Sequence, residues 1–283
     1  METSPSFEVL PPQRPAPPPK NWLGTIGAWI VGIGIAFAKY KFLLFGALKT
    51  GLSMLFMIWI YALAFGWWYA AALVFLIFVH EMGHVLAAKW LGIPVTAPVF
   101  IPFIGASILM KENPRDAWTE ALMAYGGPLA GCIGSWICLF VAFQWHQEWL
   151  IAAASTSFVI NLFNMIPIPP LDGGRICAAV SPWFWCLGLV LLGLAVLYFH
   201  AGVGIWIILV LVLISALPRM KETLFQPATE SLRLYYATHP AARAAMALMY
   251  VGLIAVLLLG YWNASQDLQY LWNMSEQGAL DNS

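Results

Sequence analysis

Two histidines and a glutamate lie close together within one apolar stretch of the chain, in the sequence His80-Glu81-Met82-Gly83-His84. In an α-helix, positions i and i+4 are about 40° apart around the axis and about 6 Å apart along it. Both imidazoles therefore project from one face and can share a zinc ion, while Glu81 lies beside them, close enough to take a proton from an activated water. The pattern predicts zinc-dependent hydrolysis.

A zinc hydrolase needs a third protein ligand and leaves one coordination position open for water. Asp172 is the acidic residue whose setting best meets this need. It follows three prolines, Pro167, Pro169 and Pro170, which end a helix, and it precedes two glycines that allow a tight turn. Such an irregular segment can bend back into a helical bundle, so we expect Asp172 to reach the two histidines.

The composition indicates where this chemistry takes place. Hydrophobic residues make up 61% of the 283 residues and charged residues 9%, against about 45–50% and about 25% in soluble domains. These values exclude a soluble single-domain enzyme. Lysine and arginine together number 13, as do aspartate and glutamate, so there is no basic field to attract nucleic acid. The four cysteines have no CxxC spacing, which favours small core residues over disulfides or a thiolate metal site.

Apolar segments long enough to cross a bilayer, or to pack against helices that do, recur along most of the chain. The expected spans are 50–66, 69–91, 120–143, 149–167, 183–199, 204–217 and 244–262. We therefore predict an all-α polytopic membrane protein with about seven transmembrane helices. Counted from Tyr69, His80 lies about 16 Å into a hydrocarbon core of about 30 Å, which makes the predicted zinc site intramembrane.

Basic residues are distributed unevenly about these spans, and this predicts the orientation. Three short turns and the C-terminal tail contain none of the thirteen lysine and arginine residues. The segments without them are 66–68, 144–148, 200–203 and 263–283. The opposite side is therefore cytoplasmic, and the predicted zinc site lies toward it. A bacterial cytoplasmic membrane is the expected location.

The segments that flank the predicted transmembrane domain, residues 50–262, have other compositions. Residues 1–20 form a proline-rich tail that we expect to be disordered, and residues 263–283 form a non-cytoplasmic tail. Residues 21–49 are expected to lie at the interface or to re-enter the bilayer. If residues 22–38 spanned instead, two basic residues before them would lie outside, whereas an interfacial segment keeps all thirteen inside.

The tract from Pro94 to Met110 is apolar but cannot form a helix, because Pro94, Pro98 and Pro102 recur among β-favouring residues. Irregular backbone is tolerated in a bilayer only where protein or a watery cavity surrounds it. We therefore expect a re-entrant β-strand or hairpin here, folded against the helices. Two functions stay open, namely lining a cavity or pairing with an extended peptide through a strand around Gly105–Met110.

Gly127 and Gly131 have the GxxxG spacing that favours close approach between helices in a membrane. Pro128 between them can kink the helix or open it locally. We interpret this motif mainly as a packing face, with a role in shaping the site as a second possibility.

Three motifs, in this order along the chain, resemble those of the site-2 protease family of intramembrane zinc metalloproteases. They are His80–His84, the stretch Gly126-Gly127-Pro128-Leu129-Ala130-Gly131, and the asparagine-to-LDGG segment 161–175. The resemblance covers about residues 68–182. It implies that one zinc ion per chain is bound by His80, His84 and Asp172. It also implies that Glu81 is the catalytic base and that Asn164 lies in the active site, where it can stabilise an oxyanion.

The resemblance implies in addition that the substrate is the transmembrane segment of another protein in the bilayer. The chain shows neither the PDZ domain nor the CBS module of some family members, so substrate selection and oligomeric state stay open. A non-proteolytic zinc-binding or transport protein with the same ligands is the alternative, and Glu81 argues against it because a transporter needs no base beside the metal. Five histidines are too few for a membrane di-iron enzyme, and neither a GxSG nor a GxGD sequence of other intramembrane proteases occurs.

Overall fold

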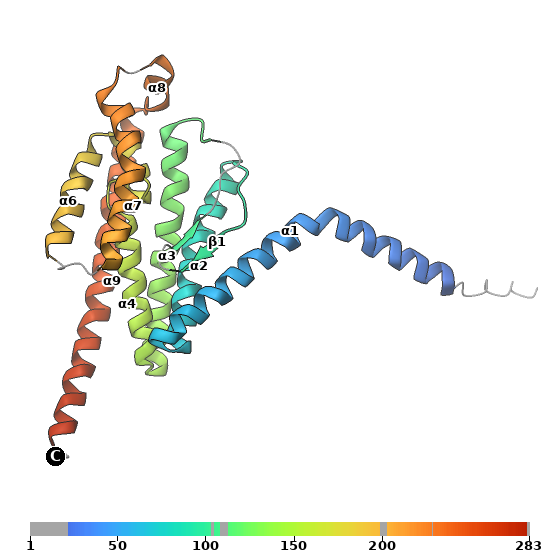
Figure 1. The fold of residues 1–283 in the computed structure, drawn as a ribbon, viewed down its shortest axis with the longest axis horizontal. Coiled ribbons are helices and arrows are strands. Elements are labelled where there is room, and N and C mark those ends of the chain that lie inside the picture. The colour runs from blue at the N-terminus through green and yellow to red at the C-terminus, as the bar shows by residue number, and fades with distance from the viewer. Residues whose placement is uncertain (1–21, 103–104, 108–112, 199–202, 228, 282–283) are drawn as a thin grey trace, which may run out of the picture. The chain divides into compact units, whose positions relative to one another are not determined.

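The computed structural model describes residues 22–102, 105–107, 113–198, 203–227 and 229–281, which are mostly helical (Figure 1). The chain divides into two compact units, residues 1–45 and 46–283. The described part of the first unit is the beginning of one long helix, α1 (Trp22–Phe65). The rest of α1 and all later described elements belong to the second unit.

The second unit is a helical bundle with one small pair of strands. Its elements after α1 are α2 (Trp67–Trp90), β1 (Val99–Ile101), β2 (Gly105–Ser107), α3 (Ala117–Trp145), α4 (Glu148–Asn164), α5 (Asp172–Val180), α6 (Phe184–Tyr198), α7 (Val203–Met220), the π-helical turn η1 (Lys221–Phe225), α8 (Glu230–Tyr235) and α9 (Pro240–Asp281).

Helix α3 lies at the centre of this unit, because it packs against α2, α4, α5 and α9. Figure 1 shows α3, α4 and α9 alongside one another. Leu139 of α3, Phe158 of α4 and Leu257 of α9 belong to one cluster of fully buried side chains. The bundle is thus held by tight packing around α3, the interaction that drives helix association where lipid replaces water.

Turn chemistry determines where the two central helices begin and end. Gly66 before α2 and Gly92 after it have φ angles of 84° and 74°, a conformation that glycine adopts without steric cost. Helix α3 begins after Asp116, whose carboxylate accepts a hydrogen bond from Thr119 N–H at 2.7 Å. This is a helix N-cap, which satisfies a backbone donor that the helix itself cannot pair.

Four described helical segments are long and apolar enough to cross a membrane, judged by length and composition. They are Phe45–Phe65, Trp67–Trp90, Ala117–Trp145 and Pro240–Tyr270. Each coincides with a predicted span. The other three predicted spans fall on α4, α6 and α7, helices of 17, 15 and 18 residues, so the count of seven spans remains a prediction.

Two helices extend beyond the spans predicted for them. Helix α1 begins at Trp22 and runs through the segment expected to be interfacial, and α9 continues to Asp281 through the segment expected to be a tail. Neither of the added stretches, 22–49 and 263–281, contains a proline. Polar side chains mark the edge of an apolar run, but they do not by themselves end a helix.

The proline-rich tract after α2 contains the antiparallel strand pair β1–β2, in which Val99 faces Ser107 and Ile101 faces Gly105. The entry of this tract into the bilayer remains a prediction. Residues 108–110 of the tract lie outside the described residues, as do the proline-rich tail 1–20 and residues 200–202 of a predicted turn.

Helix α1 holds the outer edge of β1. Thr50 Oγ1 donates to the carbonyl oxygen of Pro98 at 2.7 Å, and Phe100 N–H donates to Ser53 Oγ at 3.1 Å. Alternate residues of an antiparallel strand direct their N–H groups to opposite edges. The first strand is therefore bonded on both sides, to α1 and to β2.

Candidate active site

The histidine motif lies in the middle of α2, at the point where α2 approaches α3 most closely through two glycines. A Cβ atom on Gly83 would lie 2.1 Å from the carbonyl oxygen of Gly126, and one on Gly126 would lie 2.6 Å from that of Gly83. Only glycine permits this backbone contact. The contact carries His80 and His84, one helical turn apart, against the centre of the bundle.

The two imidazoles and the predicted third ligand converge on one point. His80 Nε2 and His84 Nε2 lie 3.2 Å apart, and each lies 3.3 Å from Asp172 Oδ2. In the part of the chain that the structure describes, this is the group of His, Cys, Asp and Glu side chains whose ligand atoms could hold a metal ion. His80 and Asp172 are buried, and His84 is partly buried.

The other nitrogen of each imidazole has an oxygen acceptor. His84 Nδ1 lies 2.9 Å from the carbonyl oxygen of Met123, which can only accept. His80 Nδ1 lies 2.9 Å from Asn161 Oδ1, and the Asn161 amide nitrogen donates to the carbonyl oxygen of Ser157 at 2.8 Å. Both Nδ1 atoms therefore carry a proton, and in the neutral form of each ring the lone pair of Nε2 is directed toward Asp172.

This arrangement fits a metal ion. With both rings neutral, three electron-rich atoms face one another with no proton between them, and a cation satisfies all three. Two atoms bound to one tetrahedral zinc ion at about 2.0–2.1 Å lie about 3.3–3.4 Å apart. The spacings of 3.2 and 3.3 Å agree with that value. Two imidazoles and a carboxylate are also a donor set that zinc accepts.

Asp172 reaches the histidines because the segment before α5 folds tightly against that helix. A Cβ atom on Gly173 would lie 2.2 Å from the carbonyl oxygen of Met165, and one on Gly174 would lie 2.2 Å from the carbonyl carbon of Ile168. The two glycines predicted to allow a turn thus allow the irregular segment to contact the first turn of α5. Asp172 is the first residue of that turn.

Glu81 lies beside the three converging atoms. It is buried, and its carboxylate is near enough to His84, His80 and Asp172 to interact with them electrostatically. A carboxylate in this position can accept a proton from a water molecule held near the metal ligands. Its part in catalysis remains a prediction.

The two asparagines of α4 occupy different places. Asn161, which the motif analysis did not single out, is the residue that contacts His80. Asn164, predicted to lie in the active site, donates from Nδ2 to the carbonyl oxygen of Ile160 at 3.1 Å, so its role stays untested. The sequence did contain a signal for Asn161, because an amide in a largely apolar helix seldom lacks a partner inside the bundle.

The GxxxG motif of α3 faces the same site. A Cβ atom on Gly127 would lie 2.2 Å from His84 Nε2, and one on Gly131 would lie 2.2 Å from Asn161 Oδ1. The motif leaves room for side chains of α2 and α4 as well as for close helix packing. The motif therefore also shapes the site, which was the second possibility raised for it, because its glycines leave space for His84 and Asn161.

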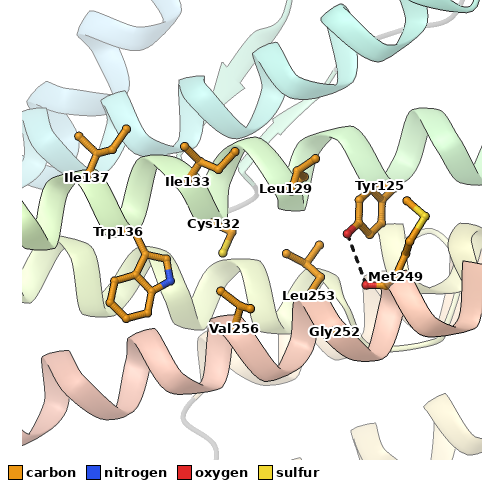
Figure 2. A pocket seen from close by; sticks show the side chains of 10 residues that line it. All are labelled: Tyr125, Leu129, Cys132, Ile133, Trp136, Ile137, Met249, Gly252, Leu253 and Val256. Atoms are coloured by element: carbon orange, nitrogen blue, oxygen red, sulfur yellow. Dashed lines mark hydrogen bonds between the residues drawn. The ribbon is translucent and has the colours of Figure 1, made fainter.

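A groove of about 460 Å³ runs between α3 and α9, lined from Tyr125 to Ile137 on one side and from Met249 to Val256 on the other (Figure 2). Its walls are almost entirely apolar. It contains none of the residues predicted to do chemistry. The converging histidines and Asp172, not this groove, form the candidate active site.

Comparison with known proteins agrees with this geometry. The profile of peptidase family M50 matches residues 68–150 and 141–185. Zinc metalloprotease MJ0392 of Methanocaldococcus jannaschii is 31% identical over 120 residues, which cover 39% of this chain and 34% of that protein. The probable chloroplastic zinc metalloprotease EGY2 of Oryza sativa, in both the indica and japonica subspecies, is 26% identical over 181 residues, or 47% of this chain and 33% of that protein.

The chain spans about a third of the length of the curated relatives it matches. The matched segment nevertheless includes the parts of the fold that build the candidate site, namely α2, α3, α4 and α5. Residues 68–185, which carry His80, His84 and Asp172, are therefore similar to peptidase family M50, the site-2 protease family.

Proposed function

We propose that this protein is an intramembrane zinc metalloprotease that hydrolyses a peptide bond within or near the transmembrane segment of a membrane-protein substrate. The observation that carries the proposal is the convergence of His80 Nε2, His84 Nε2 and Asp172 Oδ2 at 3.2–3.3 Å. The matched relatives bear the name zinc metalloprotease, which supports zinc as the ion.

His80, His84 and Asp172 would hold one zinc ion. Bound zinc supplies Lewis-acid chemistry, which polarises a peptide carbonyl and makes water a stronger nucleophile. Glu81 takes a proton from the attacking water and passes it to the leaving amine. Met123 and Asn161 keep the histidine protons on Nδ1, so that both Nε2 atoms stay available as ligands.

Asn164 is proposed to stabilise the oxyanion that forms on the substrate carbonyl. Its Nδ2 donates to the carbonyl oxygen of Ile160 one turn earlier in α4. The amide would exchange this acceptor for the substrate oxygen when the substrate binds. Its position at the last residue of α4, next to the irregular segment that leads to Asp172, supports the assignment.

A peptide bond inside a helix is shielded by its own hydrogen bonds, so the substrate must unwind before it is cut. We propose that the unwound segment pairs with strand β2, by addition of a strand to an open sheet edge. The contacts of Thr50 and Ser53 with β1 support this choice, because they occupy the outer edge of that strand. The outer edge of β2 is then the side on which a third strand can pair.

The protein is an integral membrane protein, with at least four described helices of spanning length. We propose seven spans, a cytoplasmic amino terminus and an active site toward the cytoplasm of a bacterial membrane. The ion pairs of Glu120 with Arg175 and Arg219 support this arrangement, because all three residues are predicted to lie near one side of the membrane.

The decisive experiment compares Glu81→Gln with Asp172→Ala in the purified full-length protein. Glu81→Gln is expected to retain about one zinc per chain and to lose cleavage, because the ligands remain while the proton acceptor is removed. Asp172→Ala is expected to lose zinc. Substrates can be found as membrane proteins that accumulate uncut in cells carrying the Glu81→Gln form.

Two outcomes would overturn the proposal. A Glu81→Gln protein that binds zinc and still cleaves a membrane substrate would remove Glu81 from the mechanism. Full zinc retention in Asp172→Ala would show that the three converging atoms are not the ligand set.

A further inference from the structure

Glu120, near the start of α3, is a buried carboxylate that the proposed mechanism does not use. It is 4% exposed. Arg219 of α7 donates to it in a fork, from Nη2 to Oε2 at 2.8 Å and from Nη1 to Oε1 at 3.2 Å. Arg175 Nε donates to Oε1 at 3.1 Å, and the Tyr235 hydroxyl donates to Oε2 at 2.6 Å.

These bonds join α3 to three later elements through one carboxylate, so Glu120 has a partner on each of α5, α7 and α8. Burial and the adjacent Glu120 carboxylate raise the pKa of Tyr235 above its ordinary range, so the phenol stays protonated as a donor. Charge-assisted bonds of this kind are shorter and stronger than neutral ones. They hold the four elements in one relative position.

We call these four residues, Glu120, Arg175, Arg219 and Tyr235, the Glu120 cluster. The Glu120 cluster is directly linked to the helix that carries Asp172. Arg175 lies three residues after Asp172, on the same helical turn of α5. Trp185 Nε1 donates to the carbonyl oxygen of Gly174 at 2.8 Å, and the Arg219 guanidinium lies 5.7 Å from the Trp185 ring centroid. Helix α5 is therefore bonded to the cluster through its side chain at position 175 and through its backbone at position 174.

Helix α5 is short, so contacts with other elements hold it in place. It has nine residues, fewer than the roughly 12–15 that an isolated helix needs for stability. Its first two residues after Asp172 are glycines, which contribute no side-chain contacts of their own. The direction of the Asp172 carboxylate is thus determined by what holds α5 from outside, and ligand direction strongly affects metal affinity.

We infer that Glu120 is a positioning residue for the metal site, and that Arg219 and Tyr235 act through it to orient Asp172 toward His80 and His84. The inference rests on the proposed function, since it assigns a role in holding the metal. Arg219 and Tyr235 lie beyond residue 185, where the family match ends. The C-terminal part of this chain therefore completes the ligand geometry of the matched segment.

The test measures metal binding by the full-length protein in detergent or nanodiscs, with Zn²⁺ and Co²⁺ as probes. The variants are Arg219→Gln and Tyr235→Phe, and the control is Arg233→Gln, an exposed arginine on α8 beside Tyr235. Two quantities are recorded below the unfolding temperature of the metal-free protein: the ligand-field spectrum of bound Co²⁺ and the rate at which a chelator removes Zn²⁺. The unfolding temperature of each metal-free protein is measured separately.

Arg219→Gln is expected to release zinc about tenfold faster and to alter the cobalt spectrum, because it removes a residue that helps to orient the ligand Asp172. Tyr235→Phe removes one hydroxyl and keeps both ion pairs, so a smaller change in the same direction is expected. Arg233→Gln should match the wild type. If Arg219→Gln does not fold, the Tyr235→Phe result decides.

A wild-type spectrum and release rate in the folded variants, with only a lower unfolding temperature, would overturn the inference and leave the cluster a structural one. This result is distinct from failure of the proposed function. If the proposed function fails, the wild-type protein itself binds neither Zn²⁺ nor Co²⁺, and the inference fails together with the proposed function.

Discussion

In each histidine, one oxygen acceptor determines which ring nitrogen is available to bind a metal ion. Met123 and Asn161 accept from the two Nδ1 atoms, so both Nε2 lone pairs point to the same place as the Asp172 carboxylate. Neither acceptor belongs to the HExxH motif. A histidine pair with the same spacing but without these acceptors would be free to rotate or to exchange tautomers.

Asn161→Leu is expected to weaken zinc binding by about 10–100-fold, because the substitution removes the acceptor that orients His80. Isothermal titration or competition with a chelator would measure this. Asn164→Leu, three residues along the same helix, is the matched control. It should keep zinc affinity, because its amide bonds to Ile160 rather than to a ligand, and should lower cleavage alone. Equal zinc affinities in the two variants would contradict this division of roles.

Gly127→Ala is expected to disturb the site by steric contact alone. The added Cβ would lie 2.2 Å from His84 Nε2, so the imidazole must move and zinc affinity should fall at least about tenfold. Gly252→Ala is the control, since a Cβ on that residue of α9 meets no atom within 4 Å. Zinc titration of both variants is the measurement, and unchanged affinity in Gly127→Ala would show that the ring is not held there.

At the scale of elements, side-chain hydrogen bonds from α1 reach the first strand and the residue before it, while β2 lies against α2. The Phe100 amide points to Ser53, so Phe100 and Ala106, which face each other, do not exchange hydrogen bonds. The Ala106 amide is therefore directed to the outer edge of β2, where the proposed substrate strand would pair.

Ala106→Pro removes this outward amide without removing a bond of the strand pair, and proline is accepted at such edge positions. Cleavage is expected to fall at least about tenfold, because one of the few backbone bonds to the substrate is lost and its register disturbed. Zinc content should not change. Ser107→Ala, which keeps its amide, should cleave normally. Full activity of a folded, zinc-loaded Ala106→Pro protein would reject strand pairing.

At the scale of the whole molecule, the positions of the basic residues and of the helix termini are consistent with one orientation in the membrane. The end of α2 and the start of α3 flank the strand pair, while the start of α2 and the end of α3 are joined to segments without lysine or arginine. The Glu120 cluster collects residues from four elements near the side rich in basic residues. The proposed orientation follows from this asymmetry.

Cysteine labelling in intact cells tests the orientation. In a variant without the four native cysteines, Gln147→Cys, between α3 and α4, should react with a membrane-impermeant maleimide added outside. Arg233→Cys on α8 should react only after the membrane is opened, because the cytoplasmic side carries the basic residues. Labelling in the opposite order would reverse the proposed topology.

The sequence alone was sufficient for features that depend on short spacing. Helical periodicity places His80 and His84 on one face of α2, and the apolar runs correctly located four helices of spanning length. The prolines indicated an irregular segment before Asp172, but the glycines predicted to allow a tight turn lie in the first turn of α5, which begins at Asp172. These features follow from interactions between residues a few positions apart.

Only the tertiary structure decided which distant groups meet. Asn161 lies 81 positions from His80 along the chain, and Arg219 lies 99 from Glu120. Neither pair has a local pattern that identifies its partner, because such contacts depend on how closely whole helices pack. The Gly83–Gly126 approach of α2 to α3 is one such determinant. Local sequence patterns were therefore enough to propose the ligands, whereas helix packing determined which residues orient them.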